Sequence, residues 1–385
     1  MKKFYFSLIT ICFSILVSAQ TVSTFSFTIN GTAPAGLASA LNSAAQRWSN
    51  YITITVPIKV NIFFVNSSSY PFSGMTLANG RKNFTNAPVS NYIYTTALAN
   101  QLAGTELNIG EHDMDIYVNL YTHFYFGTGK PTNSQMDFIT MIMHEIGHGL
   151  GFYSDGYVNS SNIGSFGNIP SSAIFPLSTT FPWHGQDSVP SIYDKYIIKQ
   201  SHNNLVGIEP NNTTMLADSI KNTLNYFDGP TFANASNGGL PVKLSGGTGT
   251  FTLGVDLLHL NNTVCGSIMS YCWGNGDTVR APAIWELGIL KEIGWTINPL
   301  SGINKIASTE NVFTVYPNPS HDNIFFSSSI QKEKIKSIEL KNMLGEKVLD
   351  LMNNSSVNVS DLPNGIYFVI ITTTDFRGVQ KFIRN

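Results

Sequence analysis

The stretch that decides the fold of this chain is His144-Glu145-Ile146-Gly147-His148-Gly149-Leu150-Gly151-Phe152. It closes a segment from Asn133 to Leu150 whose apolar residues recur at helical spacing, and the glycines that follow are typical of a helix end. The two histidines are four positions apart, which places them one turn apart on the same helix face. Together they can therefore bind one metal ion. The apolar stripe of this helix consists of Met136, Ile139, Met143 and Ile146.

Glu145 directly follows the first of these histidines. A carboxylate at this position can take a proton from metal-bound water and pass it to a leaving amine. We expect one catalytic zinc ion, because zinc tolerates an open coordination position and lowers the pKa of bound water to about 7. The alternative is a pair of histidines on a solvated helix face, which the apolar neighbourhood disfavours. The motif thus predicts a zinc-dependent hydrolase.

The longer stretch resembles the signature of the metzincin zinc peptidases, H-E-x-x-H-x-x-G-x-x-H. Gly151 matches the glycine at which the helix of that family ends, so that the chain can turn beneath the metal. The third histidine of the signature has no counterpart here, because Ser154 occupies its position and Asp155 is one residue out of register. A third metal ligand must come from elsewhere in the chain.

A second likeness to the metzincins lies downstream. Ser267-Ile268-Met269-Ser270-Tyr271 resembles their Met-turn, in which the methionine lies under the metal site. His259 comes ten residues before Met269 and 111 residues after His148. Leishmanolysin-like metzincins carry an insertion and bring their third histidine shortly before the Met-turn, so the resemblance implies His259 as the third ligand. The alternative is a buried core histidine. Other histidines lie in loop-like sequence or near the C-terminus: His112, His123, His184, His202 and His321.

The same resemblance implies a role for Tyr271, which matches a tyrosine that approaches the metal in astacin-like and serralysin-like members. A phenolic hydroxyl can stabilise the oxyanion of the reaction, although a tyrosine beside a tight turn can equally be a packing residue. The family fold implies an α+β catalytic domain over residues 20–298, with a twisted mixed sheet, an active-site helix and a loop-rich lower subdomain. The implied activity is hydrolysis of peptide bonds in extracellular proteins.

Periodicity predicts the elements around the motif. Apolar and polar residues alternate in three predicted strands, and helical spacing recurs in three further segments. The sequence between Tyr153 and Asp256 is rich in Gly, Ser, Asn and Pro, so we expect mainly loops there. The strands are expected at Thr24–Asn30, Ile52–Phe64 and Met114–Leu120, and the helices at Leu37–Trp48, Thr214–Phe227 and Pro282–Glu292.

The N-terminus predicts export. Two lysines precede a short apolar run, and small residues at Val17-Ser18-Ala19 suit a signal peptidase, so residues 1–19 are expected to be a signal peptide. No later segment is long and apolar enough to cross a membrane. Cys265 and Cys272 lie close together in an exported chain and could form a disulfide or remain free thiols. The formal net charge of −2 lacks the basic surplus that nucleic-acid binding requires.

The composition changes after a linker at residues 299–309, where short strands separated by turns predict a small all-β sandwich over residues 310–385. Its phrases Val315-Tyr316-Pro317-Asn318-Pro319, Gly345-Glu346-Lys347-Val348 and Leu362-Pro363-Asn364-Gly365-Ile366-Tyr367 resemble the C-terminal sorting domain of the type IX secretion system of Bacteroidetes. The resemblance implies the type IX machinery as a partner and a secreted or cell-surface location. The alternative is a plain β-sandwich appendage.

Three other functions are compatible with the sequence. One is a catalytically inactive adhesin or binding protein on the same scaffold, which the intact Glu145 disfavours. Another is a zinc amidase that acts on cell-wall peptides. In the third, Glu209 or Glu286 replaces His259 as in glutamate-liganded zinc peptidases, which leaves the Met-turn unexplained. Structural calcium is also open, since several aspartates could bind it but form no recognisable loop: Asp113, Asp115, Asp187 and Asp228.

Overall fold

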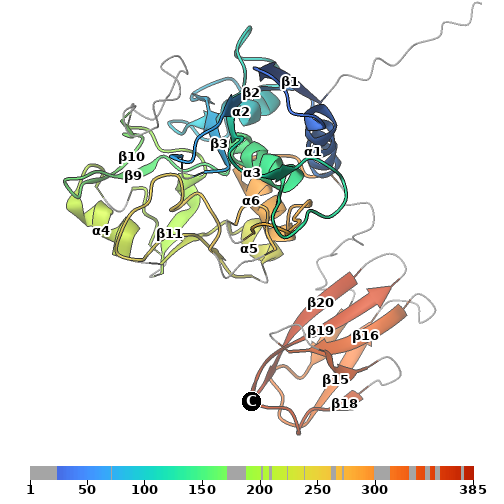
Figure 1. Cartoon of the computed structure of the whole chain (residues 1–385). Coiled ribbons are helices and arrows are strands. Elements are labelled where there is room, and N and C mark those ends of the chain that lie inside the picture. The colour runs from blue at the N-terminus through green and yellow to red at the C-terminus, as the bar shows by residue number, and fades with distance from the viewer. Residues whose placement is uncertain are drawn as a thin grey trace, which may run out of the picture. The chain divides into compact units, whose positions relative to one another are not determined.

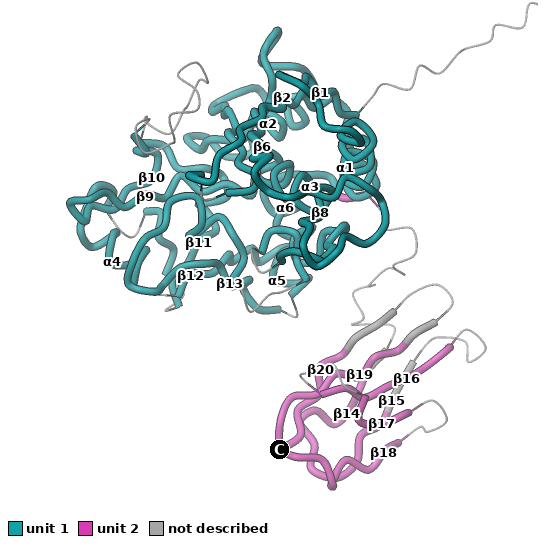
Figure 2. Tube along the Cα trace, viewed as in Figure 1, with its two compact units in different colours: residues 1–296 teal, residues 297–385 magenta. Residues whose placement is uncertain are grey.

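The computed structural model divides into two compact units, residues 1–296 and 297–385 (Figure 2). The signal peptide and the linker lie outside the residues that the structure describes. None of the helices in the described part is long and apolar enough to span a bilayer. The described residues are 24–70, 72–170, 188–200, 203–207, 210–222, 224–237, 239–261, 266–270, 273–298, 313–328, 335–342, 347–351, 356–373 and 377–385.

A four-stranded sheet forms the base of the first unit, in the order β1-β2-β6-β3. Strands β1 (Phe25–Asn30), β2 (Ile58–Val65) and β6 (Met114–Asn119) run parallel, and β3 (Gly74–Ala78) pairs antiparallel with β6 at the edge. All six residues of β6 are buried, as expected for a strand that is covered on both faces. Strands β1 and β3 are the two edges of this sheet.

Three helices gather around this sheet (Figure 1). Helix α1 (Leu37–Tyr51) connects β1 to β2 and buries the apolar side predicted from its spacing, including Leu41 and Trp48. Helix α3 (Phe138–Leu150) packs against β3, α1 and α2 (Thr96–Ala103). Every residue of α3 is buried, so the metal-binding motif lies inside the unit and not on a solvated helix face.

The second half of this unit contains more regular structure than the sequence suggested. Two small sheets form where loops were expected, one of β9 and β10 and one in the order β11-β12-β13. Helix α6 closes the unit near the predicted position. The elements are β9 (Gly156–Val158), β10 (Gly164–Phe166), η2 (Asp194–Tyr196), β11 (Ile197–Lys199), α4 (Thr214–Asn222), β12 (Asn225–Phe227), α5 (Ala233–Ser236), β13 (Val242–Lys243) and α6 (Ile284–Ile293).

Two of the helix boundaries predicted from the sequence were wrong. Helix α3 does not start near Asn133, because β8 (Met136–Asp137) pairs with β7 (Phe124–Tyr125) and Asp137 caps the helix by accepting from Thr140 N at 3.1 Å. The helix predicted over Thr214–Phe227 ends at Asn222, because the following residues pair with β11 as strand β12. Long-range pairing overrides local helical spacing in both places.

The predicted strand Ile52–Phe64 also begins later, at Ile58. The Gln101 side chain accepts from the backbone N–H groups of Thr55 and Val56, at 2.8 and 3.1 Å, and so holds this segment as a turn. Two short strands complete the unit and pair with each other: β4 (Gly80–Arg81) and β5 (Tyr94–Thr95).

The second unit is all-β, with one sheet in the order β14-β15-β18 and another in the order β17-β16-β19-β20. Side chains from both sheets share one core, among them Ile324 and Val369. This is the sandwich that the sequence predicted, with one short strand, β18, that it did not. The strands are β14 (Phe313–Tyr316), β15 (Asn323–Ser328), β16 (Ile335–Lys341), β17 (Lys347–Asp350), β18 (Ser356–Asn358), β19 (Gly365–Thr373) and β20 (Arg377–Arg384).

Candidate metal centre

Three histidine side chains converge inside the first unit. The Nε2 atoms of His144 and His148 lie 3.1 Å apart, and the Nε2 atom of His259 lies 3.0 Å from the first and 3.3 Å from the second. All three side chains are buried. They form the one group of three or more His, Cys, Asp and Glu residues in the described part of the chain that could hold a metal ion.

The second ring nitrogen of each histidine bonds to a backbone carbonyl. His144 Nδ1 lies 2.7 Å from Ile268 O, His148 Nδ1 lies 2.7 Å from Phe152 O, and His259 Nδ1 lies 3.1 Å from Val255 O. A carbonyl only accepts hydrogen bonds, so each Nδ1 carries the proton and each Nε2 presents a lone pair. The three lone pairs therefore point toward one another.

The electrostatics of the cluster match this assignment. Burial, together with the neighbouring histidine, lowers the pKa of His144 to about 3, and burial lowers that of His148 to about 4. The pKa of His259 lies well below its ordinary value for the same reasons. Neutral imidazoles are the form that binds metal.

The geometry fits a zinc ion. Zinc–nitrogen bonds of about 2.0–2.1 Å in a tetrahedral arrangement place the nitrogens about 3.3 Å apart. The observed separations of 3.0 to 3.3 Å are close to this value. Three converging lone pairs repel one another unless a cation lies between them, and backbone carbonyls that orient the ligating rings are the usual outer shell of such a site. The donor set therefore fits zinc.

Glu145 follows His144 in helix α3, and the edge strand β3 holds its side chain. Thr76 Oγ1 lies 2.7 Å from Glu145 Oε2 and 2.8 Å from the carbonyl oxygen of the same residue, so its single proton can serve either acceptor. Burial raises the pKa of Glu145 to about 7, against the lowering effect of the Thr76 bond. A carboxyl with such a pKa is suited to exchange protons near neutral pH.

Sequence reasoning missed two residues that shape this carboxylate, Thr76 and Gly74. A Cβ atom on Gly74 would lie 2.5 Å from Met141 Sδ and 2.6 Å from Glu145 Oε1, so only glycine leaves room for the Glu145 side chain. The available signal was a glycine inside a strand-like stretch, which often marks a close approach of another group. The stretch carries no chemical motif of its own.

Met269 lies directly beneath the helix. It is fully buried, and a Cβ atom on Gly147 would overlap its sulfur. The smaller helix residue thus makes room for the methionine. Gly151 ends the helix with a φ of 122°, and a Cβ there would lie 2.7 Å from Ile293 Cδ1. Both the backbone angle and the space require glycine.

The chain after the helix explains why the third histidine is not at position 154. Ser154 Oγ donates to Asp194 Oδ1 at 2.6 Å, and Asp155 N donates to Asp194 Oδ2 at 3.0 Å. Ser191 N donates to the same carboxylate at 2.9 Å. This buried aspartate fastens the segment that follows the metal helix to the inserted region, so Ser154 has a structural role.

His259 reaches the site through tertiary pairing. Leu260 forms a parallel bridge with Ser270 and an antiparallel bridge with Leu244, and Leu260 N donates to Met269 O at 2.9 Å. The pairing brings His259 and the Met269 segment to the same side of the helix. Leu257 adopts a φ of 72°, which few non-glycine residues do, at the bend that precedes the histidine.

Glu286, which the sequence allowed as an alternative ligand, is not part of the cluster. Its two carboxylate oxygens accept from Met269 N at 2.5 Å and from Ala283 N at 2.6 Å. His112 and His123 likewise lie outside the cluster. The remaining residues predicted for the site or as alternatives lie outside the described part of the chain: Tyr271, Cys265, Cys272, Glu209, His184 and His202.

The aspartates considered for calcium are not brought together in the described part of the chain. Asp113 accepts from Lys59 N at 2.8 Å and Asn100 Nδ2 at 2.9 Å, Asp115 accepts from Asn61 Nδ2 at 2.9 Å, and Asp228 accepts from Asn234 Nδ2 at 2.5 Å. Asp187 lies outside the described residues. Each of the three described carboxylates thus accepts a hydrogen bond from another group of the protein.

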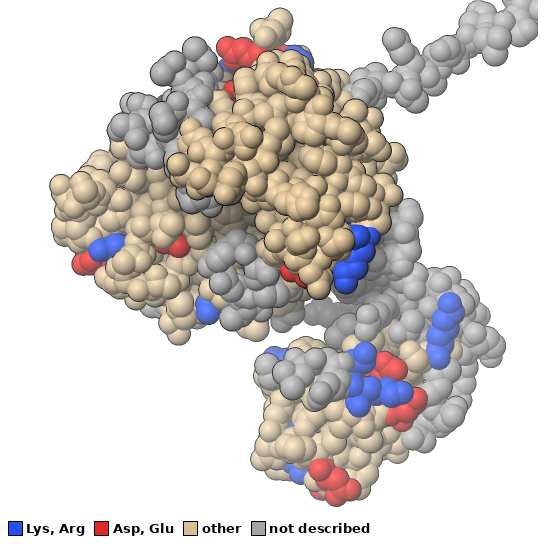
Figure 3. All heavy atoms as spheres, in the orientation of Figure 1, with Lys and Arg blue, Asp and Glu red and all other residues tan. Residues whose placement is uncertain are grey.

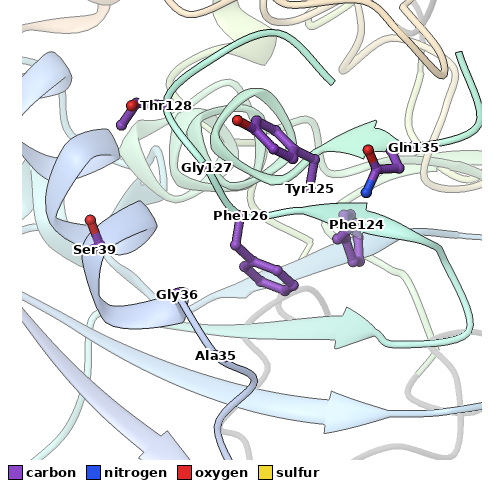
Figure 4. Close-up of a pocket in the computed structure, with 9 residues that line it drawn as sticks. All are labelled: Ala35, Gly36, Ser39, Phe124, Tyr125, Phe126, Gly127, Thr128 and Gln135. Atoms are coloured by element: carbon purple, nitrogen blue, oxygen red, sulfur yellow. The ribbon is translucent and has the colours of Figure 1, made fainter. Parts of the chain in front are cut away.

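A separate pocket of about 580 Å³ lies between the start of α1 and the segment Phe124–Thr128 (Figure 4). Aromatic and small residues line it, and none of its lining residues is charged or belongs to the histidine cluster. Charged side chains are also sparse on the face of the first unit shown in Figure 3. Neither feature contributes a chemical group to the metal centre.

Comparison with known proteins identifies the C-terminal part of the chain. No curated protein matches the sequence. The match to the sorting-domain family covers the second unit almost completely and indicates export through type IX secretion to the cell surface or the medium, with the secretion machinery as a partner. Residues 314–385 belong to the family described as "Secretion system C-terminal sorting domain".

Proposed function

We propose that this chain is a secreted zinc-dependent endopeptidase that hydrolyses peptide bonds in extracellular proteins. The observation that carries the proposal is the convergence of three Nε2 atoms within 3.3 Å of one another, two of them on the helix that also carries the buried Glu145. The buried, neutral histidines favour a metal site over a structural histidine cluster, since a purely structural cluster gains nothing from opposed lone pairs.

Each residue has a role in this proposal. His144, His148 and His259 hold the metal, and Glu145 takes the proton of the attacking water and delivers it to the leaving amine nitrogen. When bound there, zinc supplies Lewis-acid polarisation of the scissile carbonyl and acidifies a water molecule. Thr76 and Gly74 keep the Glu145 carboxylate in position. Tyr271, which lies outside the described residues, is proposed to donate to the oxyanion.

We further propose that the catalytic unit belongs to the metzincin type. Support comes from the parallel strands β1, β2 and β6 with the antiparallel edge strand β3, from the helix that ends at Gly151, and from Met269 beneath the helix. The position of His259 shortly before this methionine supports the leishmanolysin-like arrangement. The edge strand lies next to Glu145, where an extended peptide could add to the sheet.

Zinc content and proteolysis measured on the full-length chain test the proposal. We expect near-stoichiometric zinc and cleavage of casein by the wild type. Glu145→Gln should retain zinc and lose activity by a factor of about 10³, because the general base is gone. His259→Ala should lose both. Glu111→Gln and His112→Ala are matched controls, since Glu111 is exposed and neither residue lies in the cluster.

The other outcomes separate the alternatives. Zinc without cleavage of any protein, but with cleavage of cell-wall peptides, would replace the endopeptidase by an amidase. A zinc-bound wild type that cleaves neither substrate would favour the inactive binding protein. A wild type free of zinc after purification in zinc-containing buffer would contradict the metal centre itself.

A further inference from the structure

Glu286 is a buried carboxylate that no step of the proposed reaction uses. It lies on α6 and is fully buried. A buried carboxylate costs several kcal/mol unless it is paired or hydrogen-bonded. Its partners are therefore informative about what it does.

The partners of Glu286 come mainly from the segment Ser267–Met269. One carboxylate oxygen accepts from Met269 N at 2.5 Å, and the other accepts from Ala283 N at 2.6 Å. The carboxylate also bonds to the Ser267 side chain and to the Ile268 backbone. One side chain thus fixes three consecutive residues beneath the histidine cluster.

The middle residue of this segment connects it to a metal ligand. Ile268 O accepts from His144 Nδ1 at 2.7 Å and also from Trp273 Nε1 at 3.2 Å. The ring of Trp273 in turn lies edge-on to the His144 ring, with the ring centres 5.4 Å apart. The orientation of His144 therefore depends on where the Ile268 carbonyl is held.

We propose that Glu286 is a positioning residue of the metal centre, which acts through the Ser267–Met269 backbone and Ile268 O on the imidazole of His144. This inference rests on the zinc site of the proposed function. Groups that orient a metal ligand typically contribute about 10- to 100-fold to metal affinity. A purely structural role in the fold would leave that affinity unchanged.

The chain offers a matched control on the same helix. Glu292 also accepts backbone N–H groups, from Phe232 at 2.6 Å and from Ala233 at 3.3 Å. These partners belong to α5 and its start, and no hydrogen bond links them to a histidine of the cluster. The same chemical change at Glu292 therefore tests whether loss of any helix α6 carboxylate weakens the site.

The experiment measures zinc dissociation constants by chelator competition, and the visible absorption of the cobalt-substituted protein, on the full-length chain. Glu286→Gln replaces one acceptor oxygen by an amide N–H that faces other N–H donors. We expect its zinc affinity to fall by about 10- to 100-fold, with a changed cobalt spectrum, while Glu292→Gln stays within about twofold of the wild type. The cobalt spectrum reports ligand geometry, which a merely structural role would not alter.

The outcomes are separable. A folded Glu286→Gln variant with wild-type affinity and spectrum would overturn this inference and leave the proposed function standing. A wild type that binds neither zinc nor cobalt would overturn both. Should Glu286→Gln not fold, Glu286→Asp carries the test, since it keeps the charge but draws the carboxylate back by one methylene. Its zinc affinity should fall by at least about threefold, and unchanged affinity would count against the positioning role.

Discussion

The two parts of the chain that form the candidate metal centre are positioned in different ways. Helix α3 supplies His144, Glu145 and His148 from five consecutive residues. The distal segment, Thr252–Asn261 with Gly266–Ser270, supplies His259 and Met269 and has no helix or named strand of its own. Its described backbone pairs through isolated bridges, at Leu260 with both Leu244 and Ser270.

This difference shows how much of a metal site can be local. Helical geometry alone places the two histidines one turn apart, and burial of the whole helix keeps them neutral. The distal segment instead depends on contacts with partners far away in the sequence, among them Glu286 and the helix itself. We therefore expect the helix to keep its structure without metal and the distal segment to depend on it.

The largest expected effect concerns the anchor of the helix. Asp137 caps α3 and forms two contacts with Arg280, Nε to Oδ2 at 2.7 Å and Nη2 to Oδ1 at 2.5 Å. The Asp137 side chain is 1% exposed and that of Arg280 is 11% exposed. Removing one partner of such a buried pair typically costs 3–5 kcal/mol, because the other charge stays buried. Arg280→Met should therefore lower the free energy of unfolding by about 3 kcal/mol, measured by urea denaturation.

Arg47→Met is the control for this prediction. Arg47 is half-buried and donates to Arg280 O at 3.0 Å, but it forms no ion pair with Asp137. Its replacement should cost less than about 1 kcal/mol. Equal losses in the two variants would show that the Asp137–Arg280 pair does not anchor α3. The Arg280 guanidinium also donates to backbone carbonyls of the preceding loop, those of Gly127, Thr128 and Gly129.

The site residues of helix α3 were largely predictable from sequence patterns, and those of the distal segment were not. Apolar spacing, the histidine pair and the terminal glycine all lie within a few residues of one another, so local rules suffice for them. The start of the helix was predicted wrongly, because Met136–Asp137 pairs with a strand that local spacing does not reveal. His259 was assigned through a family likeness, since no periodicity marks a residue that lies 111 positions from its partner.

Residues that act by close approach were not predicted, because a glycine in a strand-like stretch does not show which group approaches it. Gly74 and Thr76 lie on a short edge strand, and their importance arises only when Glu145 packs against them. Likewise, Ser154 occupies the position of the third histidine in the metzincin signature, and its hydroxyl donates a hydrogen bond to Asp194. The chemistry of a motif can be deduced from sequence, but the groups that hold it in place depend on the complete fold.

Metal removal should separate the two regions. After chelation, amide hydrogen exchange of residues 256–261 should accelerate by about 10- to 100-fold, because the metal no longer ties His259 to the helix. Amides inside α3 are bonded within the helix and should change by less than about threefold. Mass spectrometry of peptic peptides measures both regions in one experiment.

The His259→Ala variant provides the control, since its distal segment should exchange rapidly with or without chelator. Comparable acceleration in α3 and in the distal segment would contradict the expected difference between the two regions, because it would mean that the metal organises the helix as well. No acceleration in either region would mean that packing alone holds His259 in place.

The smallest expected effect lies where the Met269 side chain of the distal segment packs against Gly147 of the helix. In the wild type, Gly147→Ala should gain about 1 kcal/mol of helix propensity but lose about 1–3 kcal/mol by crowding the Met269 thioether. The net loss should be near 1 kcal/mol, since a methionine can shift. In a Met269→Ala background the crowding disappears, so the same substitution should become stabilising, with a coupling of about 2 kcal/mol in urea denaturation at one fixed excess of zinc. A coupling near zero would mean that Met269 does not lie against Gly147, and the packing of the distal segment beneath the helix would have to be abandoned.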